Sequence, residues 1–191
     1  MSALVTVLRA ASLLAFAGPM VLVAGRRRAR PRTPGSPERG GRAPVVANLA
    51  AFGLFFVCLL VFAGRSDASI GLLLALSGCF LALAGAALVG RSRVELGRAW
   101  SLVAKADQGT GLVTTGPYRL VRHPIYLGFA LLALGQAFAF GSWFALVIVL
   151  CAIMPTFAWR ARAEETVLSR TFGERYAGYR QGAKMIIPYL L

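Results

Sequence analysis

The chain has 191 residues, of which 58% are hydrophobic, and it carries 21 Lys and Arg residues against 7 Asp and Glu residues. A water-soluble domain this apolar could not cover its hydrophobic surface, whereas apolar runs separated by arginine clusters are typical of proteins that cross a bilayer. The composition therefore excludes an ordinary soluble protein and predicts a single membrane domain, residues 1–191, with three N-terminal spans in residues 1–90.

Five membrane spans are predicted in all. The first three cover residues 4–24, 45–64 and 68–89. Residues 125–159 hold no charged side chain, and a single helix of that length would measure about 50 Å, well beyond a bilayer core of about 30 Å. We therefore predict a helical hairpin that turns near Gly141 and Ser142. The fold class is all-α, a polytopic bundle whose last helix continues into the cytosol.

The third span carries small residues at intervals of four, namely Gly78, Ala82, Ala86 and Gly90. Small residues at this spacing let helix backbones approach closely in lipid. The stripe suits either packing within the bundle or a homodimer. We favour packing within the bundle and expect a monomer or a weak homodimer.

Nineteen of the 21 basic residues fall in three segments next to the predicted spans. These segments are residues 26–42, residues 91–122 and the tail after Trp159. Because Lys and Arg collect on the cytosolic side, we expect an outer N-terminus and a cytosolic C-terminal tail, in the cytoplasmic membrane of a bacterium. The arginines flank spans and lack an aromatic platform, so anionic lipid rather than nucleic acid is the expected partner.

The cysteines offer no sign of redox or metal chemistry. Cys58, Cys79 and Cys151 all lie in predicted spans, with no CxxC pair and no histidine nearby. This pattern predicts buried core residues and no metal site.

Residues 116–126, with the sequence GPYRLVRHPIY, join the third span to the hairpin and contain the only histidine. Pro124 suits the first position of a helix, with His123 just outside it. The free N–H groups and the dipole of a helix start, next to Arg119 and Arg122, predict an anion site at the membrane surface. The plainer alternative is a basic membrane flank followed by a proline helix start.

A charged helix is predicted to follow the hairpin. Arg160 and Glu164 are four residues apart and can pair on one helix face. Adjacent glutamates point about 100° apart on a helix, so one of Glu164 and Glu165 is expected to face a pocket, with Glu165 the less certain choice. The alternative is a solvated helix held by ion pairs. These carboxylates, however, leave the membrane on the same side as the Arg122-His123 turn.

These two motifs resemble those of the isoprenylcysteine carboxyl methyltransferase and phospholipid methyltransferase family. The resemblance rests on Leu96-Gly97, Trp100-Ser101, residues 111–115, Gly116-Pro117-Tyr118, Arg122-His123-Pro124-Ile125-Tyr126, Glu164-Glu165, Leu168, Phe172-Gly173, Tyr176, Tyr179 and Pro188. It covers about residues 96–191, while the first three spans match only as generic membrane helices. One departure is the turn at residues 182–185, GAKM, where the family tends to carry a more basic or proline-containing turn.

The resemblance implies an integral membrane enzyme that moves a methyl group from S-adenosylmethionine to a lipid-like acceptor. Residues 91–191 would then form the methyltransferase core, with a cytosolic cofactor site and an acceptor that enters from the bilayer. The implied cofactor-binding residues are Tyr118, Arg122, His123, Pro124, Tyr126, Glu164, Glu165, Tyr176 and Tyr179. The implied catalytic residues are Arg160, Glu164 and Glu165. Arg160 would orient a carboxylate acceptor, whereas an amine acceptor would need a glutamate or His123 as its base.

Three functions remain open at this point. The favoured one is methyl transfer to the carboxylate of an isoprenylcysteine-type substrate. The second is N-methylation of phospholipid amines or of another small nucleophile. The third is a non-enzymatic membrane protein, such as a small permease subunit or a scaffold, although the few polar residues within the spans disfavour transport.

Overall fold

The computed structural model describes residues 2–24, 43–64, 68–97 and 111–188. Their long helices are α1 (Ser2–Ala24), α2 (Ala43–Val61), α3 (Ala68–Leu96), α4 (Pro124–Ala139), α5 (Trp143–Ile148), α6 (Met154–Phe172) and α7 (Glu174–Gly182). Two shorter turns are the 3-10 helix η3 (Gly116–Arg119) and the π-helix η4 (Val149–Ile153). In this part of the chain the only strand-like pairing is one bridge between Val121 and Lys184. The predicted all-α bundle is confirmed; the arginine-rich segment of residues 26–42 and Trp100-Ser101 lie outside the described residues.

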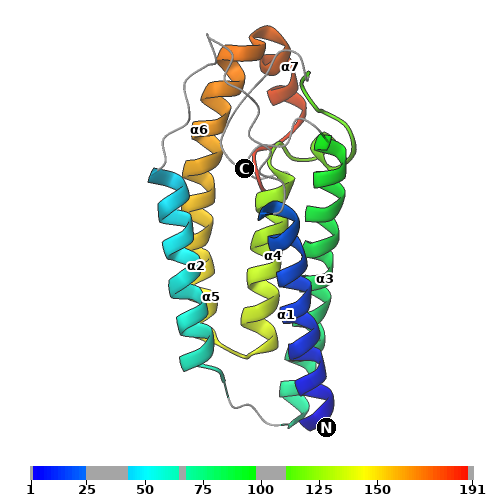
Figure 1. The fold of residues 1–191 in the computed structure, drawn as a ribbon, viewed down its shortest axis with the longest axis vertical. Helices are drawn as coiled ribbons and strands as arrows, with labels where there is room; N and C mark the ends of the chain where they lie inside the picture. Colours follow the sequence, from blue (N-terminus) through cyan, green and yellow to red (C-terminus); the bar gives the residue numbers. More distant parts are fainter. Residues whose placement is uncertain (1, 25–42, 65–67, 98–110, 189–191) are drawn as a thin grey trace.

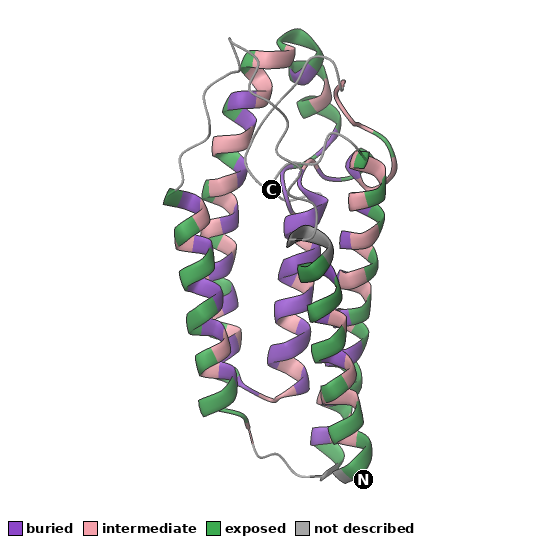
Figure 2. Cartoon of the chain, in the orientation of Figure 1, coloured by how far each residue is buried: buried purple, intermediate pink, exposed green. Residues whose placement is uncertain are grey.

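Helix α4 forms the middle of the bundle. It contacts α1 and α3 on one side, while α2 packs against α5 and α6 on the other, as Figure 1 shows. Figure 2 shows that α4 is mostly buried and has no exposed residue, whereas the flanking helices turn exposed faces outward. Those faces are apolar: the side chains of Leu60, Phe80 and Trp143 are each more than 70% exposed. Outward apolar faces fit a lipid environment, and the chain is an integral membrane protein.

Among the described residues, four helical segments are long and apolar enough to cross a membrane: residues 3–21, 43–61, 69–96 and 143–172. The fifth predicted span is α4, an apolar helix of 16 residues. At the usual rise it measures about 24 Å, less than the bilayer core of about 30 Å. The described part of the bundle therefore contains four helical segments of spanning length and a shorter central helix, which needs local thinning of the bilayer or burial among its neighbours.

The predicted hairpin is confirmed, with its turn at the predicted place. Gly141 adopts a positive φ of 60°, a conformation that suits glycine. The Ser142 hydroxyl then accepts a hydrogen bond from the Ala145 N–H at 3.3 Å and so caps the start of α5. Because both arms rise at the same rate from this turn, residues near Arg160 are brought level with Pro124, at the far end of α4.

The second arm of the hairpin is one continuous helical segment, residues 143–172, made of α5, η4 and α6. The π-turn η4 ends just before Pro155, whose missing N–H cannot complete the usual helical ladder. Thirty residues measure about 45 Å, so the helix extends beyond the bilayer core as predicted. Trp143 and Trp159 are exposed near the two ends of its apolar part, as aromatic residues at membrane interfaces are.

The small residues of α3 pack within the bundle, as we favoured. A Cβ atom on Gly78 would lie 2.4 Å from the Ala139 nitrogen, and one on Gly85 would lie 2.6 Å from the Gly128 oxygen. The spacing differs from the predicted interval of four, because the close contacts involve Gly78, Ala82 and Gly85 whereas Gly90 faces open space. Alternating steps of four and three keep a helix seam facing its partner, which a constant step of four does not.

The prediction that all three cysteines are core residues was right only for Cys79, which is buried. Cys58 is half-buried and Cys151 is exposed. Cys151 lies on η4, whose inward face is formed by Val149 and Ile153. The outward face of this turn places the thiol toward the surrounding lipid.

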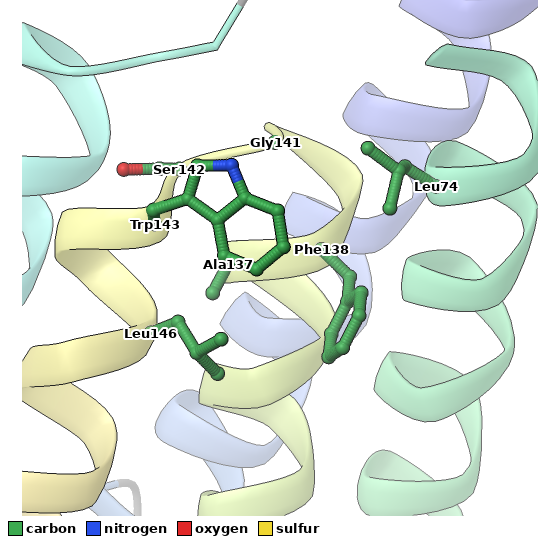
Figure 3. Close-up of a pocket in the computed structure, with 7 residues that line it drawn as sticks. All are labelled: Leu74, Ala137, Phe138, Gly141, Ser142, Trp143 and Leu146. Carbon is green, nitrogen blue, oxygen red and sulfur yellow. The ribbon is translucent and has the colours of Figure 1, made fainter. Parts of the chain in front are cut away.

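At the hairpin end of the bundle, α3, α4 and α5 leave a small, partly open hollow. Figure 3 shows the residues that line it: Leu74, Ala137, Phe138, Gly141, Ser142, Trp143 and Leu146. None of them carries a charge, and the hollow lies at the opposite end of α4 from His123. The chemistry suggested by the sequence motifs must therefore be sought at the other end.

Candidate active site

The segment that leads into α4 is built as the sequence predicts. Pro124 is the first residue of α4 and His123 is its N-cap residue. Before them, Pro117 starts the short helix η3, which buries the side chain of Tyr118. The two proline-started helices place Arg122 and His123 in a short turn at the end of the central helix.

One ion pair joins this turn to α6, and a second lies within α6 beside it. The Arg122 Nε donates to Glu165 Oε1 at 2.7 Å, and both side chains are only about 10% exposed. The Arg160 Nε donates to Glu164 Oε1 at 3.3 Å, which confirms the predicted pairing four residues apart. The Arg180 Nε, from α7, lies 3.9 Å from Glu165 Oε2. We call this group, together with His123, the charged cluster.

His123 lies between the two carboxylates. Its Nδ1 is 3.6 Å from Glu164 Oε2, and its Nε2 is 3.5 Å from Glu165 Oε1. The prediction that one glutamate would face the site was therefore wrong, because both do, and Glu165 is the more buried of the two. Although adjacent helical positions diverge by about 100°, the two side chains converge again on opposite edges of one imidazole ring.

Aromatic rings pack against the charged cluster on the side of the buried core. The His123 ring stacks on Tyr126 at a centroid distance of 5.4 Å, and Tyr126 stacks on Phe157 at 5.0 Å. The Arg160 guanidinium lies over the Tyr126 ring at 5.4 Å, where the ring face attracts a cation. The Tyr126 hydroxyl donates to Glu164. Tyr126 therefore ties the turn, the acidic pair and the apolar interior together.

The tyrosines after α6 belong to the same region. The Tyr179 hydroxyl donates to the Tyr118 carbonyl oxygen at 2.6 Å, and the Tyr176 and Tyr179 rings meet at 6.1 Å. Burial raises the pKa of Tyr179 to about 12 and raises the pKa values of Tyr118 and Tyr176 further. All three hydroxyls are therefore protonated at neutral pH and can act as hydrogen-bond donors, as Tyr179 does to the Tyr118 carbonyl oxygen.

Two buried polar atoms in this region make no hydrogen bond within the described part of the chain. They are the Tyr176 hydroxyl oxygen and His123 Nε2. Buried polar atoms without a partner are uncommon in native proteins, because each costs about 1–3 kcal/mol. His123 Nε2 lies 3.5 Å from Glu165 Oε1, whereas a polar ligand bound beside the charged cluster would give the Tyr176 hydroxyl a partner.

The expectation of free N–H groups at the start of α4 was wrong for three of them. The N–H groups of Arg122 and His123 donate to the Lys184 and Met185 carbonyl oxygens at 2.7 and 2.9 Å, and the Tyr126 N–H donates to the His123 oxygen. The chain after α7 folds back beside the turn and accepts the first two of these hydrogen bonds. The GAKM turn thus binds through its backbone, which explains how it can depart from the family pattern in its side chains.

Arg122 is the residue that joins these parts. Besides Glu165, its guanidinium donates to the carbonyl oxygens of Ala183 and Arg180. These acceptors come from α6, from α7 and from the segment after α7. The guanidinium therefore holds the turn against both helices.

A sequence model of the phospholipid methyltransferase family matches residues 69–175, more than half of the chain. The chain belongs to this family. The family match begins at α3, so it extends further toward the N-terminus than the motifs suggested. It includes the whole charged cluster except Arg180, and it excludes Tyr176 and Tyr179.

Individual relatives agree with the family. The chain is 33% identical over 113 residues to protein-S-isoprenylcysteine O-methyltransferase of Schizosaccharomyces pombe, covering 58% of this chain and 48% of that protein. It is 28% identical over 115 residues to protein-S-isoprenylcysteine O-methyltransferase A of Arabidopsis thaliana, covering 59% and 58% respectively. The chain thus spans about half the length of the curated relatives it matches.

A solved structure has the same fold. It is that of a eukaryotic intramembrane Ras methyltransferase, isoprenylcysteine carboxyl methyltransferase, with a TM-score of 0.58 and 18% sequence identity. The similarity covers 90% of this chain and 60% of that one. At this identity it shows that the helical arrangement is shared.

Sequence reasoning missed Phe157, Arg180 and Glu95 as neighbours of the site. Phe157 lies seven residues before Glu164, a spacing that places both on one helix face and could have indicated its position under Tyr126. Arg180 reaches the cluster through the fold of α7 over α6, and no local pattern reveals that. The Glu95 carboxylate accepts a hydrogen bond from the Thr115 hydroxyl, and no local pattern connects two residues twenty positions apart.

Proposed function

We propose that the protein is a membrane methyltransferase that takes a methyl group from S-adenosylmethionine and passes it to the carboxylate of an isoprenylcysteine-type lipid. The observation that carries this proposal is the charged cluster around His123, at the membrane edge and within the region that matches the family. The names of the curated relatives support the same reaction.

The residues of the cluster fit the chemistry of S-adenosylmethionine, which carries a carboxylate, an ammonium group, ribose hydroxyls and an adenine ring. The unpartnered Tyr176 hydroxyl and the partly exposed Arg180 offer donors for its anionic and hydroxyl groups. Glu164, which is 22% exposed, offers an acceptor for its ammonium group. When bound, the cofactor would supply an electrophilic methyl group on a sulfonium.

The described part of the cluster contains three guanidinium groups and two carboxylates. This leaves an excess of positive charge, which attracts an anionic acceptor and repels an ammonium. A carboxylate also needs no base, because it carries no proton to lose. The charge balance therefore favours carboxyl methylation over N-methylation.

The role proposed for each residue of the cluster follows from where it lies. Arg160 lies over Tyr126 at the outer edge of the cluster and orients the acceptor carboxylate. Arg122 and Glu165 are buried, and they hold the turn that carries His123. Phe157 and Tyr126 seal the apolar side, so that water is kept from the reacting groups.

N-methylation of a phospholipid amine is the second candidate. The description of the matching family as phospholipid methyltransferase favours it. In that case Glu164, the more exposed glutamate, would remove the amine proton.

The test begins with equilibrium binding of S-adenosylmethionine to the purified protein in detergent. Methyl-labelled cofactor is then supplied with three lipids: a prenylated cysteine with a free carboxylate, its preformed methyl ester, and phosphatidylethanolamine. We expect binding, and base-labile label in the free carboxylate alone. Label in the amine headgroup would replace the first candidate by the second, and absence of binding would remove both.

We further propose that the charged cluster faces the cytosol in the cytoplasmic membrane. The chain ends that join the arginine-rich segments lie at the same end of the bundle as the cluster (Figure 1), and the positive-inside rule supports this orientation. In a variant whose three native cysteines are replaced by alanine, we expect Gly182→Cys to react with an impermeant maleimide only after permeabilisation. Ala63→Cys, at the other end, serves as the control and should react in intact cells. The opposite pattern would invert the topology.

A further inference from the structure

Glu95 lies outside the charged cluster, on the last turn of α3, and holds the segment that leads into η3. The Thr115 hydroxyl donates to Glu95 Oε1. A Cβ atom on Gly116 would lie 3.0 Å from both the carboxyl carbon and Oε2 of Glu95. The carboxylate therefore sits directly against the Thr115-Gly116 backbone.

This contact lies at the turn that leads into η3. Gly116 adopts a positive φ of 56°, and a side chain there would also meet Glu95. Thr115 is the N-cap residue of η3, yet its side chain makes no capping hydrogen bond. The hydroxyl that would normally cap the helix is directed to α3 instead, which ties the turn to a membrane-embedded helix.

The Thr115-Gly116 turn positions two tyrosines of the candidate site. Tyr118 is buried two residues after Gly116, and its carbonyl oxygen accepts the Tyr179 hydroxyl at 2.6 Å. Tyr179 contacts Tyr176, whose hydroxyl has no partner in the described part of the chain. A continuous series of contacts thus runs from Glu95 to the polar groups proposed to meet the cofactor.

We propose that Glu95 is a positioning residue of the cofactor pocket, acting through Thr115 and Tyr118 rather than by touching the cofactor. The inference rests on the proposed function, because its main readout is cofactor affinity. The Thr115–Glu95 contact is exposed, so its own contribution to stability is small, and the proposed effect lies in the orientation of the turn that carries Tyr118.

The experiment compares Glu95→Ala, Glu95→Gln and Thr115→Val with the unchanged protein. We expect Glu95→Ala to weaken S-adenosylmethionine binding about tenfold, since a hydrogen bond to a charged group is lost. At saturating cofactor, turnover should stay within about twofold of the unchanged protein. Glu95→Gln keeps an acceptor oxygen and should restore most of the affinity. Glu174→Ala, which removes an exposed carboxylate on α7, is the matched control.

A second readout needs no cofactor. Hydrogen exchange of the amides of residues 115–120 should become faster in Glu95→Ala and Thr115→Val, while residues 143–155 keep their protection. If the unchanged protein fails to bind the cofactor, the proposed function is wrong. The exchange data still test whether Glu95 holds residues 115–120 in place. If the unchanged protein binds but the variants match it in affinity and exchange, Glu95 has no positioning role. Should Glu95→Ala not fold, Thr115→Val decides the same question.

Discussion

Replacing Glu165 by methionine is expected to destabilise the protein by about 3–5 kcal/mol, because it leaves the Arg122 guanidinium buried without its carboxylate. Both side chains of this pair are only about 10% exposed. Glu164→Met should cost less, since Glu164 is 22% exposed and pairs with the more accessible Arg160. Unfolding by heat or denaturant in a mild detergent, followed by loss of helical signal, measures the difference.

The double variant Arg122→Met with Glu165→Met tests whether the loss in stability comes from the unpaired Arg122 charge. When both charges are removed no buried ion is left unpaired, so the double variant should lose less stability than the sum of the two single variants. Full recovery is not expected, because Arg122 also donates to the Ala183 and Arg180 carbonyl oxygens. Arg162→Met, on the exposed side of α6, is the control for removing a charge. Simple additivity would show that the pair does not act as a unit.

The position of the site could be predicted because helix geometry links distant parts of this chain. A charge-free stretch too long for one span required a hairpin, and equal rise in its two arms brings Arg160 beside the turn before Pro124. The proline at the helix start and the pair four residues apart are local features, and both were found as expected. Helix geometry therefore predicted that these charged residues lie at the same end of the bundle.

The arrangement inside the site could not be predicted in the same way. His123 meets both carboxylates because its ring lies between them, and that depends on how far α6 stands from α4. The N–H groups of Arg122 and His123 are taken by the chain after α7, a pairing over about 60 residues with no local signature. Such long-range contacts follow from packing, which a helix pattern does not contain.

The second large effect is expected at Arg160. Arg160→Gln should lower kcat/KM for a prenylated cysteine carboxylate about tenfold to a hundredfold, because a charge-assisted contact with the acceptor is lost. The affinity for S-adenosylmethionine should change little, since Arg160 lies over Tyr126 at the edge of the cluster rather than beside Tyr176. Arg160→Lys keeps the charge but loses the planar fork, and should recover part of the activity. Initial rates over a range of acceptor concentrations measure these effects.

Two matched variants show whether Arg160 acts on the acceptor. Arg162→Gln removes the same charge two residues away, on the exposed face of α6, and should leave kcat/KM unchanged. Glu164→Gln removes the partner of Arg160 but leaves the guanidinium in place. For a carboxylate acceptor, turnover of Glu164→Gln at saturating cofactor should remain close to that of the unchanged protein, because no base is required. A fall of about 10²–10⁴-fold would instead identify Glu164 as a base and the acceptor as an amine. A loss in Arg160→Gln confined to cofactor affinity would move Arg160 from the acceptor to the cofactor.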